Sequence, residues 1–292
     1  VTRDDAETVK QYVNEEMFVE SIVKSAIENN VRTISLTEHY NLSSLEIARN
    51  IAKGSLEIIP GIEIGSSLLD YGISKKHVCH FTAYFVNRKI YKILDEYEIN
   101  RKKNVVKIIS RLNKMGISIT SGQIAREVKK ESIGRYDIAY TLFKKGYAVS
   151  PAHAYSKYLD VGKNAYVERE KMEPTKLIDT IIKCGGVPVL AHPKSLKFNN
   201  NDLEAFINIF KKAGLCGIEV YNPHNSAEKR EELLELCDKH NLIPTVGSDF
   251  HNFDSNIKIG LGIGENLKVS DYSIITRLKD AKNKIDENNK LR

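Results

Sequence analysis

Apolar and polar residues follow one another along most of this chain in blocks that predict strands and helices in turn. Short runs rich in Val, Ile and aromatic residues predict strands over residues 33–37, 56–64, 77–86, 187–190, 216–221 and 242–246. Apolar residues at helical spacing predict helices over residues 19–29, 43–53, 173–184, 201–213, 226–240 and 270–292. Strands that alternate with helices in this way indicate an α/β fold.

The middle of the chain departs from this alternation. Three helices are predicted in succession, over residues 88–114, 121–129 and 134–145, and they are rich in Lys and Arg. We interpret residues 98–165 as a helical subdomain inserted into the α/β fold, between residues 1–97 and residues 166–292. Its basic residues fit either a solvated face or a surface that contacts a polyanion.

Several predicted strands carry His, Asp or Glu at one end. The run 242–246 leads to Gly247 and then to Asp249 and His251, whose side chains point the same way in an extended segment. Similar runs carry His39, Glu63, His80, His192 and His224. A polar turn would explain any one of them, but the recurrence favours ligands of a metal cluster. Catalytic residues gathered at the C-terminal ends of strands are typical of α/β barrel enzymes.

The composition narrows the class of protein. Of 292 residues, 41% are hydrophobic and 28% are charged, which is ordinary for a globular domain with a sizeable core. The net charge of +6 suits anionic substrates but is too small to indicate binding to duplex nucleic acid. No run approaches the roughly 18 apolar residues of a membrane span, and no secretory signal is visible. Four scattered cysteines without a CxxC pair indicate a reducing cytoplasm and no zinc finger.

Taken in order, the motifs resemble those of the polymerase and histidinol phosphatase (PHP) superfamily. Thr37-Glu38-His39 is similar to its Thr-Asp-His motif, Gly61-Ile62-Glu63 to its Gly-x-Glu, and His80 to a His that opens a strand. Residues 185–193, GGVPVLAHP, match its Gly-Gly-x-x-x-Leu-Ala-His-Pro element, and residues 247–251, GSDFH, match its last motif. Gly134-Arg135 also has a family counterpart. The resemblance spans essentially the whole chain and implies a distorted TIM-like (β/α)7 PHP barrel with an inserted small helical subdomain.

The resemblance further implies up to three divalent metal ions. One site would use Glu63, His80 and His192, and a second would use Asp5, His39 and His251. A third would use Asp249 and the bridging Glu63, together with two histidines of an N-terminal His-x-His. Imidazoles and carboxylates without thiolates suit Mn²⁺, Zn²⁺ or Fe²⁺, and we expect Mn²⁺ first.

The resemblance also suggests roles in the reaction. Glu63, His192 and Asp249 would be catalytic. Arg135 would hold phosphate oxygens in a bidentate grip, and His224 would line the substrate pocket.

The sequence departs from the family pattern in two places. The N-terminal His-x-His of the first barrel strand is absent, and Thr2-Arg3-Asp4-Asp5 resembles the stretch that follows it. Because position 1 is Val rather than Met, we expect a piece of a longer chain whose first strand is missing; a chain that truly lacks the strand is the alternative. Where the family has a His two residues after the Arg, this chain has Asp137, which cannot help to hold an anion unless it is protonated.

From the residues and the resemblance together we predict a metal-dependent phosphoesterase. It would use a metal-activated water to hydrolyse phosphate esters. The resemblance implies that these are esters of nucleotides, either 3′,5′-nucleoside bisphosphates or the 5′ ends of short RNA. Two alternatives stay open: a small-molecule phosphatase of the histidinol-phosphate type, and a degenerate PHP scaffold that binds without turnover. Nothing in the sequence indicates a membrane or an obligate protein partner. Glu219 is either functional or only a structural hydrogen-bond partner.

Overall fold

In the computed structural model of the protein, the described residues are 15–73, 78–128, 133–168, 170–250 and 271–291. Its contacts divide the described chain into a sheet unit, residues 14–91 and 171–292, and a helical unit, residues 92–170. Strands and helices together confirm the predicted α/β class. The predicted division at residues 97–98 and 165–166 stays a prediction.

The strands of the sheet unit form a two-stranded sheet and a five-stranded sheet. They are β1 (Thr33–Ile34), β2 (Glu57–Ile58), β3 (Gly61–Ser67), β4 (Val78–Tyr84), β5 (Val187–Leu190), β6 (Gly217–Tyr221) and β7 (Ile243–Val246). The last five pair in the order β3-β4-β5-β6-β7, and β1 pairs with β2 in parallel. A parallel bridge between His39 and Glu63 continues the β1–β2 ladder onto β3. The predicted strand 56–64 is split because Pro60 has no N–H to donate to a ladder.

The direction of β4 decides which residues meet at the edge of the sheet. It runs antiparallel to both β3 and β5, whereas β5, β6 and β7 are parallel to one another. The first residues of β4 therefore lie at the same edge as the last residues of β3, β5, β6 and β7. His80, near the start of β4, thus joins side chains that follow the ends of other strands.

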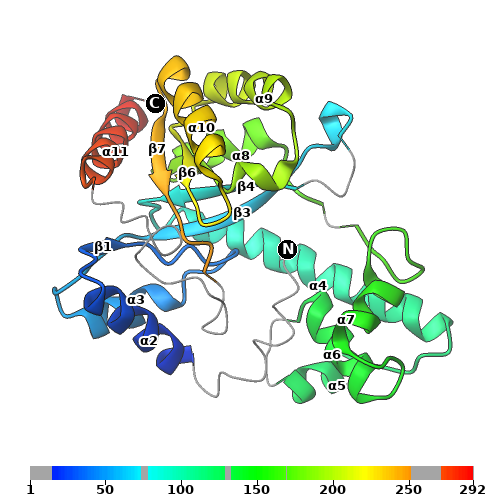
Figure 1. Ribbon diagram of the computed structural model, residues 1–292. Helices are drawn as coiled ribbons and strands as arrows, with labels where there is room; N and C mark the ends of the chain where they lie inside the picture. The colour runs from blue at the N-terminus through cyan, green and yellow to red at the C-terminus, as the bar shows by residue number, and fades with distance from the viewer. Residues whose placement is uncertain (1–14, 74–77, 129–132, 169, 251–270, 292) are drawn as a thin grey trace. The chain divides into compact units, whose positions relative to one another are not determined.

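Helices cover the sheet and bury its apolar side chains. In the sheet unit they are α2 (Glu15–Glu28), α3 (Ser44–Ala52), α8 (Pro174–Lys183), α9 (Asn200–Ala213), α10 (Ala227–His240) and α11 (Ser273–Leu291). Figure 1 shows α8 and α10 against the sheet with α9 beside them, and α11 packs on β5 and β7. Phe81 of β4 meets Phe210 of α9 edge to face, with ring centroids 5.4 Å apart. No described helix is both long enough and apolar enough to cross a membrane.

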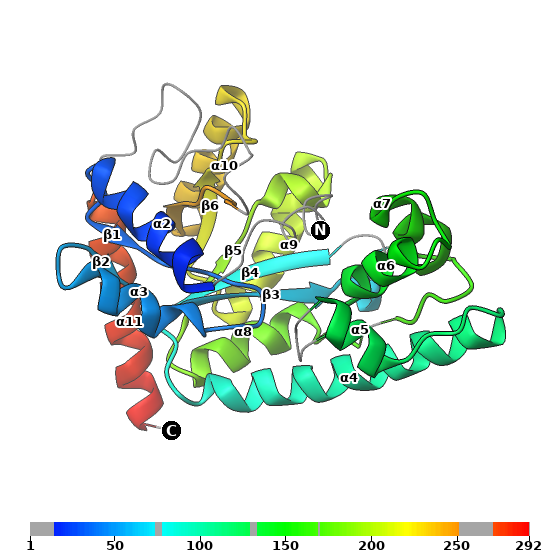
Figure 2. The same ribbon diagram turned by 90° about the horizontal axis from the view of Figure 1, so that it is seen from below.

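The helical unit has a core of its own. It holds most of α4 (Ile90–Lys114), and α5 (Ser121–Val128), α6 (Arg135–Lys144) and α7 (Pro151–Ala154), followed by a π-helical turn at Tyr155–Leu159 (Figure 2). Leu112, Ile124, Ile138, Leu142 and Leu159 are buried together in one apolar cluster. This cluster stabilises the helices of the lysine-rich segment, because each helix buries one apolar face and leaves its basic residues exposed.

We expect truncation of this core to lower stability sharply. Leu142 is fully buried in the cluster, so Leu142→Ala removes apolar contacts and leaves a cavity, at a cost of about 2–5 kcal/mol in the free energy of unfolding. Urea unfolding followed by circular dichroism measures this cost. Val149→Ala is the control, since Val149 is 83% exposed, and its change should stay within about 0.5 kcal/mol. Equal effects of the two substitutions would contradict the described core.

Candidate metal centre

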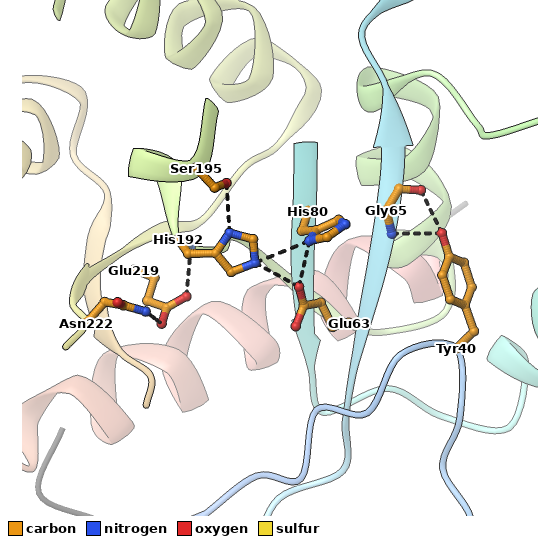
Figure 3. Close-up of polar contacts among 8 residues, drawn as sticks. All are labelled: Tyr40, Glu63, Gly65, His80, His192, Ser195, Glu219 and Asn222. Atoms are coloured by element: carbon orange, nitrogen blue, oxygen red, sulfur yellow. Dashed lines mark hydrogen bonds and ion pairs between the residues drawn. The ribbon is translucent and has the colours of Figure 1, made fainter. Parts of the chain in front are cut away.

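Three side chains of the sheet unit meet in one compact cluster. The Oε1 atom of Glu63 lies 3.0 Å from Nδ1 of His80 and 2.9 Å from Nε2 of His192. The two ring nitrogens are 3.2 Å apart (Figure 3). Glu63 is 7% exposed and His80 is 9% exposed, so the carboxylate faces the imidazoles rather than water.

Strand register explains why these residues meet. Glu63 pairs with Thr82 across the β3–β4 ladder, and His80 lies two residues before Thr82, so both side chains point to the same face of the sheet. On the other side of β4, the N–H of Ala191 donates to the carbonyl of His80 at 3.0 Å. His192, the next residue after Ala191, is therefore placed beside His80.

The ring of His80 lies close to Gly65, whose backbone is hydrogen-bonded to Tyr40. A Cβ atom at Gly65 would lie 3.0 Å from Cδ2 of His80 and 3.2 Å from the hydroxyl of Tyr40. The Tyr40 hydroxyl accepts from the N–H of Gly65 and donates to its carbonyl, both at 2.9 Å (Figure 3). Nothing in the sequence singled out Tyr40, apart from its place directly after His39.

Glu219 holds the backbone of His192. Its Oε2 accepts from the N–H of His192 at 2.8 Å, and its Oε1 accepts from the side-chain amide of Asn222 at 2.9 Å. His192 has a φ of 28°, in a region that residues other than glycine seldom adopt, so it needs such support. A Cβ atom at Gly247 would lie 2.2 Å from Glu219 Oε1, which explains the glycine at that motif position. Of the two interpretations left open for Glu219, these contacts support a positioning role.

Ser195 contacts the outer nitrogen of His192. Its hydroxyl lies 3.0 Å from Nδ1 of the ring, so Nε2 faces Glu63. Ser195 belongs to the 3-10 turn at Pro193–Leu196, directly after the histidine. Neither Ser195 nor Asn222 was predicted, because the hydroxyl and amide partners of a histidine or of its supporting carboxylate follow no spacing that the sequence reveals.

The charges in the cluster depend on one another. Burial opposes the charge on Glu63, but hydrogen bonds from His192 and His80 hold the pKa of its carboxyl well below the usual range. Burial lowers the pKa of His80 to about 4, although Glu63 acts to raise it. Burial also acts to lower the pKa of His192, yet the hydrogen bond and charge of Glu63 raise it to about 9. At neutral pH the cluster thus holds a carboxylate, a neutral imidazole and an imidazolium.

Two further predicted ligands lie near the cluster. The ring of His39 meets that of His80 edge to face, with centroids 5.2 Å apart, and its charge also acts on Glu63. Asp249 follows β7 with a φ of 49°, and its charge contributes to the raised pKa of His192. Neither belongs to the three-residue cluster found among the described residues.

The remaining predicted residues are not part of the cluster among the described residues. Asp5 and His251 lie outside the described residues. His224 is exposed in the turn after β6, where its carbonyl accepts from the side chain of Lys194. Arg135 belongs to the helical unit and lies over the rings of Tyr155 and Tyr166, at 5.5 and 5.7 Å from their centres.

Asp137 has a local role that the sequence did not reveal. Its Oδ2 accepts from the N–H of Gly134 at 2.7 Å, so it caps the start of α6. Asp137 is 7% exposed and points back to the backbone of its own helix. The carboxylate at this position therefore stabilises the helix that carries Arg135.

The cluster fits a divalent metal ion. Glu63, His80 and His192 each offer one ligand atom, and all three atoms lie within 4.8 Å of one another. Ligands about 2.1 Å from one ion and at right angles are about 3 Å apart, which matches the observed separations. A carboxylate with two imidazoles suits Mn²⁺, Fe²⁺ or Zn²⁺. The imidazolium of His192 is the group whose proton an ion would replace.

Comparison with known proteins points to phosphoester hydrolysis. No protein-family model matches the chain. The chain is 28% identical over 244 residues to the 5′-3′ exoribonuclease Rnm of Escherichia coli, covering 82% of each protein. It is 26% identical over 227 residues to the 3′,5′-nucleoside bisphosphate phosphatase of Chromobacterium violaceum, covering 75% of this chain and 76% of the relative.

The fold has a counterpart among solved structures. A crystal structure from Bifidobacterium adolescentis, described as a metal-dependent phosphoesterase, superposes with a TM-score of 0.69 at 22% identity and covers 90% of each chain. It shows that the fold is shared. The relatives in sequence confirm the resemblance and the enzyme class predicted from the motifs, a hydrolase of phosphate esters.

Metal binding should release a proton near neutral pH. The pKa of His192 is raised to about 9, so its ring is protonated at pH 7.5 and must lose that proton to bind an ion, whereas His80 is already neutral. Titration with Mn²⁺ in buffers of different protonation enthalpy should give about one proton per ion, falling toward zero as the pH rises past about 9. His153→Ala, an exposed histidine of the helical unit, should leave the release unchanged. A heat of binding independent of the buffer at pH 7.5 would contradict this assignment.

Removing the negative charge of Glu219 should weaken the metal site. Both partners of its carboxylate are donors, so Glu219→Gln would place an amide NH2 group against one of them and loosen His192. We expect Mn²⁺ affinity to fall by about 10- to 100-fold, the usual effect of losing a partner of a ligand. Calorimetry measures the affinity, and Glu231→Gln on the exposed side of α10 is the matched control. Equal affinities in the two variants would overturn the positioning role.

Proposed function

We propose that this protein is a metal-dependent phosphoesterase that acts on nucleotides. Its substrates would be 3′,5′-nucleoside bisphosphates or the 5′ ends of short RNA, as the names of the relatives suggest. The observation that carries the proposal is the buried cluster of Glu63, His80 and His192, which offers one carboxylate and two imidazoles to a metal ion. A barrel built around this edge of the sheet, and a reducing, cytoplasmic setting for its free cysteines, belong to the same proposal.

The site residues would bind the metal ions that activate water for hydrolysis. Glu63, His80 and His192 would hold one ion, and His39 and Asp249 lie near enough to serve further ions together with Asp5 and His251. Bound divalent ions, Mn²⁺ in our proposal, would lower the pKa of a water and neutralise phosphate oxygens. Hydrolysis then forms a bond from water oxygen to phosphorus, breaks the ester P–O bond and transfers a proton to the leaving oxygen.

The groups around the cluster would hold its ligand atoms in position during turnover. Glu219 fixes the backbone of His192, and Tyr40 fixes the backbone of Gly65, which leaves room for the ring of His80. Because the ligand atoms are already about 3 Å apart, little rearrangement is needed to bind an ion. Arg135 would bind a phosphate group of the substrate and His224 would line its pocket; support for both is the motif resemblance.

Two other functions compete with this one. A histidinol-phosphate-type phosphatase would use the same metal chemistry on a different small molecule, and the nucleotide-directed relatives favour the nucleotide. A degenerate scaffold would bind nucleotides without turnover. The complete and preorganised Glu63–His80–His192 cluster favours turnover over the degenerate scaffold.

Phosphate release from adenosine 3′,5′-bisphosphate tests the proposal directly. With added Mn²⁺, we expect the wild-type protein to release phosphate, and His192→Ala to lose at least about a hundredfold in rate because a metal ligand is gone. His240→Ala, on α10 beside Glu204, should keep the wild-type rate. Histidinol phosphate is offered in parallel. Faster release from histidinol phosphate would select the alternative phosphatase, and nucleotide binding with no release from either substrate would select the scaffold.

A further inference from the structure

Positive charge is concentrated in the helical unit. Residues 92–170 hold 16 of the 44 basic residues and 9 of the 38 acidic residues, so their net charge is +7. The whole chain carries +6, which leaves a net charge of −1 on the rest. A polyanion would therefore be attracted to this unit rather than to the sheet unit.

One face of α6 carries aromatic and basic side chains in a row. Tyr136, Tyr140 and Lys144 are spaced four residues apart, so they lie on the same side of the helix over about 12 Å. The ring of Tyr155 stacks on that of Tyr136, with centroids 4.6 Å apart and planes 18° from parallel. Nζ of Lys144 lies 6.0 Å from the centre of the Tyr140 ring. The two tyrosines are half-buried and Lys144 is exposed.

The same face leads into a pocket that is lined by positive charge. The pocket has a volume of about 420 Å³ and lies between α5 and α6, which run side by side (Figure 2). Its lining consists of Gln123, Arg126, Glu127, Thr141, Lys144 and Lys145. Three of these six side chains are cationic and one is anionic, and Lys144 belongs to both the pocket and the row on α6. Such a lining suits a phosphate group rather than an apolar ligand.

We propose that α6 and this pocket form a binding surface for single-stranded RNA. Tyr136 and Tyr140 would stack on bases, because aromatic rings accept any base, and Arg126 and Lys144 would contact phosphates. This combination of stacking rings and neighbouring cations is typical of single-strand binding, whereas duplex binding relies on contacts to paired backbones. The inference rests on the proposed function only for its substrate class; it implies a substrate longer than one nucleotide.

Binding without turnover tests this surface. The full chain carrying His192→Ala, with Mn²⁺ present, is titrated against a 12-residue single-stranded RNA with a 5′ phosphate and a 3′ fluorescent label, followed by anisotropy. Arg126→Gln with Lys144→Gln should weaken binding at least tenfold and reduce the slope of log Kd against log salt by about 0.7 per lost phosphate contact. Tyr140→Ala should weaken it at least about fivefold through lost stacking.

A matched control and two further probes decide the outcome. Lys107→Gln removes one exposed charge from α4 of the same unit, outside the pocket, and should leave the affinity unchanged. Variants that bind as tightly as this control would overturn the proposal. The affinity for RNA could fall in the variant Arg126→Gln with Lys144→Gln but not in Tyr140→Ala, or inorganic phosphate could compete as well as RNA does. Either result would show a simple anion site and overturn RNA binding. Equal affinity for a duplex of the same sequence would overturn single-strand binding. Because no hydrolysis is measured, these outcomes stand apart from the test of the proposed function.

Discussion

The buried carboxylate of Glu63 constrains everything around it. An ionised carboxylate with 7% exposure must be matched by donors or positive charge, because an unpaired buried charge costs several kcal/mol. His80 supplies that match from β4, and His192 supplies it from the turn after β5, at 3.0 and 2.9 Å. The match requires that β4 run against β3 and β5, since only then does the start of β4 meet the end of β5. The charge balance of the cluster therefore depends on the strand directions of the sheet.

The groups around this cluster stabilise strained backbone and buried polar atoms next to it. The unusual φ of His192 is stabilised by the hydrogen bond from its N–H to Glu219, which in turn is satisfied by Asn222. Glu219 is itself buried, which raises the pKa of its carboxyl, and a glycine at position 247 leaves it room. The result is a set of ligand atoms held about 3 Å apart by packing and hydrogen bonds. Such preorganisation is what a metal centre needs if binding energy is not to be spent on rearrangement.

The sequence predicted the parts of this arrangement that local pattern controls. Apolar periodicity located helices such as α8 and α10 within one or two residues. The motifs identified Glu63, His80 and His192 because each follows or opens an apolar run. The antiparallel course of β4 could not be predicted, since strand direction depends on pairing between segments far apart in the chain. Nor could Tyr40 or Asn222, whose importance arises only from contacts made after folding.

In the helical unit, too, the sequence alone could not predict the role of the basic residues. Its lysines and arginines fitted either a solvated face or a polyanion surface, and composition alone could not choose. The row of side chains on α6 depends on the helical period, which places Tyr136, Tyr140 and Lys144 on one face. The pocket depends on the packing of α5 beside α6. Asp137, which looked like a loss of anion binding, instead stabilises the start of that helix.

The proposed function depends on a divalent ion bound by Glu63, His80 and His192. Crystals grown with Mn²⁺ and measured at the manganese absorption edge test it most directly, because the anomalous signal locates the ion itself. We expect a peak about 2.0–2.3 Å from Oε1 of Glu63, Nδ1 of His80 and Nε2 of His192. Strong anomalous peaks elsewhere in the molecule, with none at these three atoms, would contradict it.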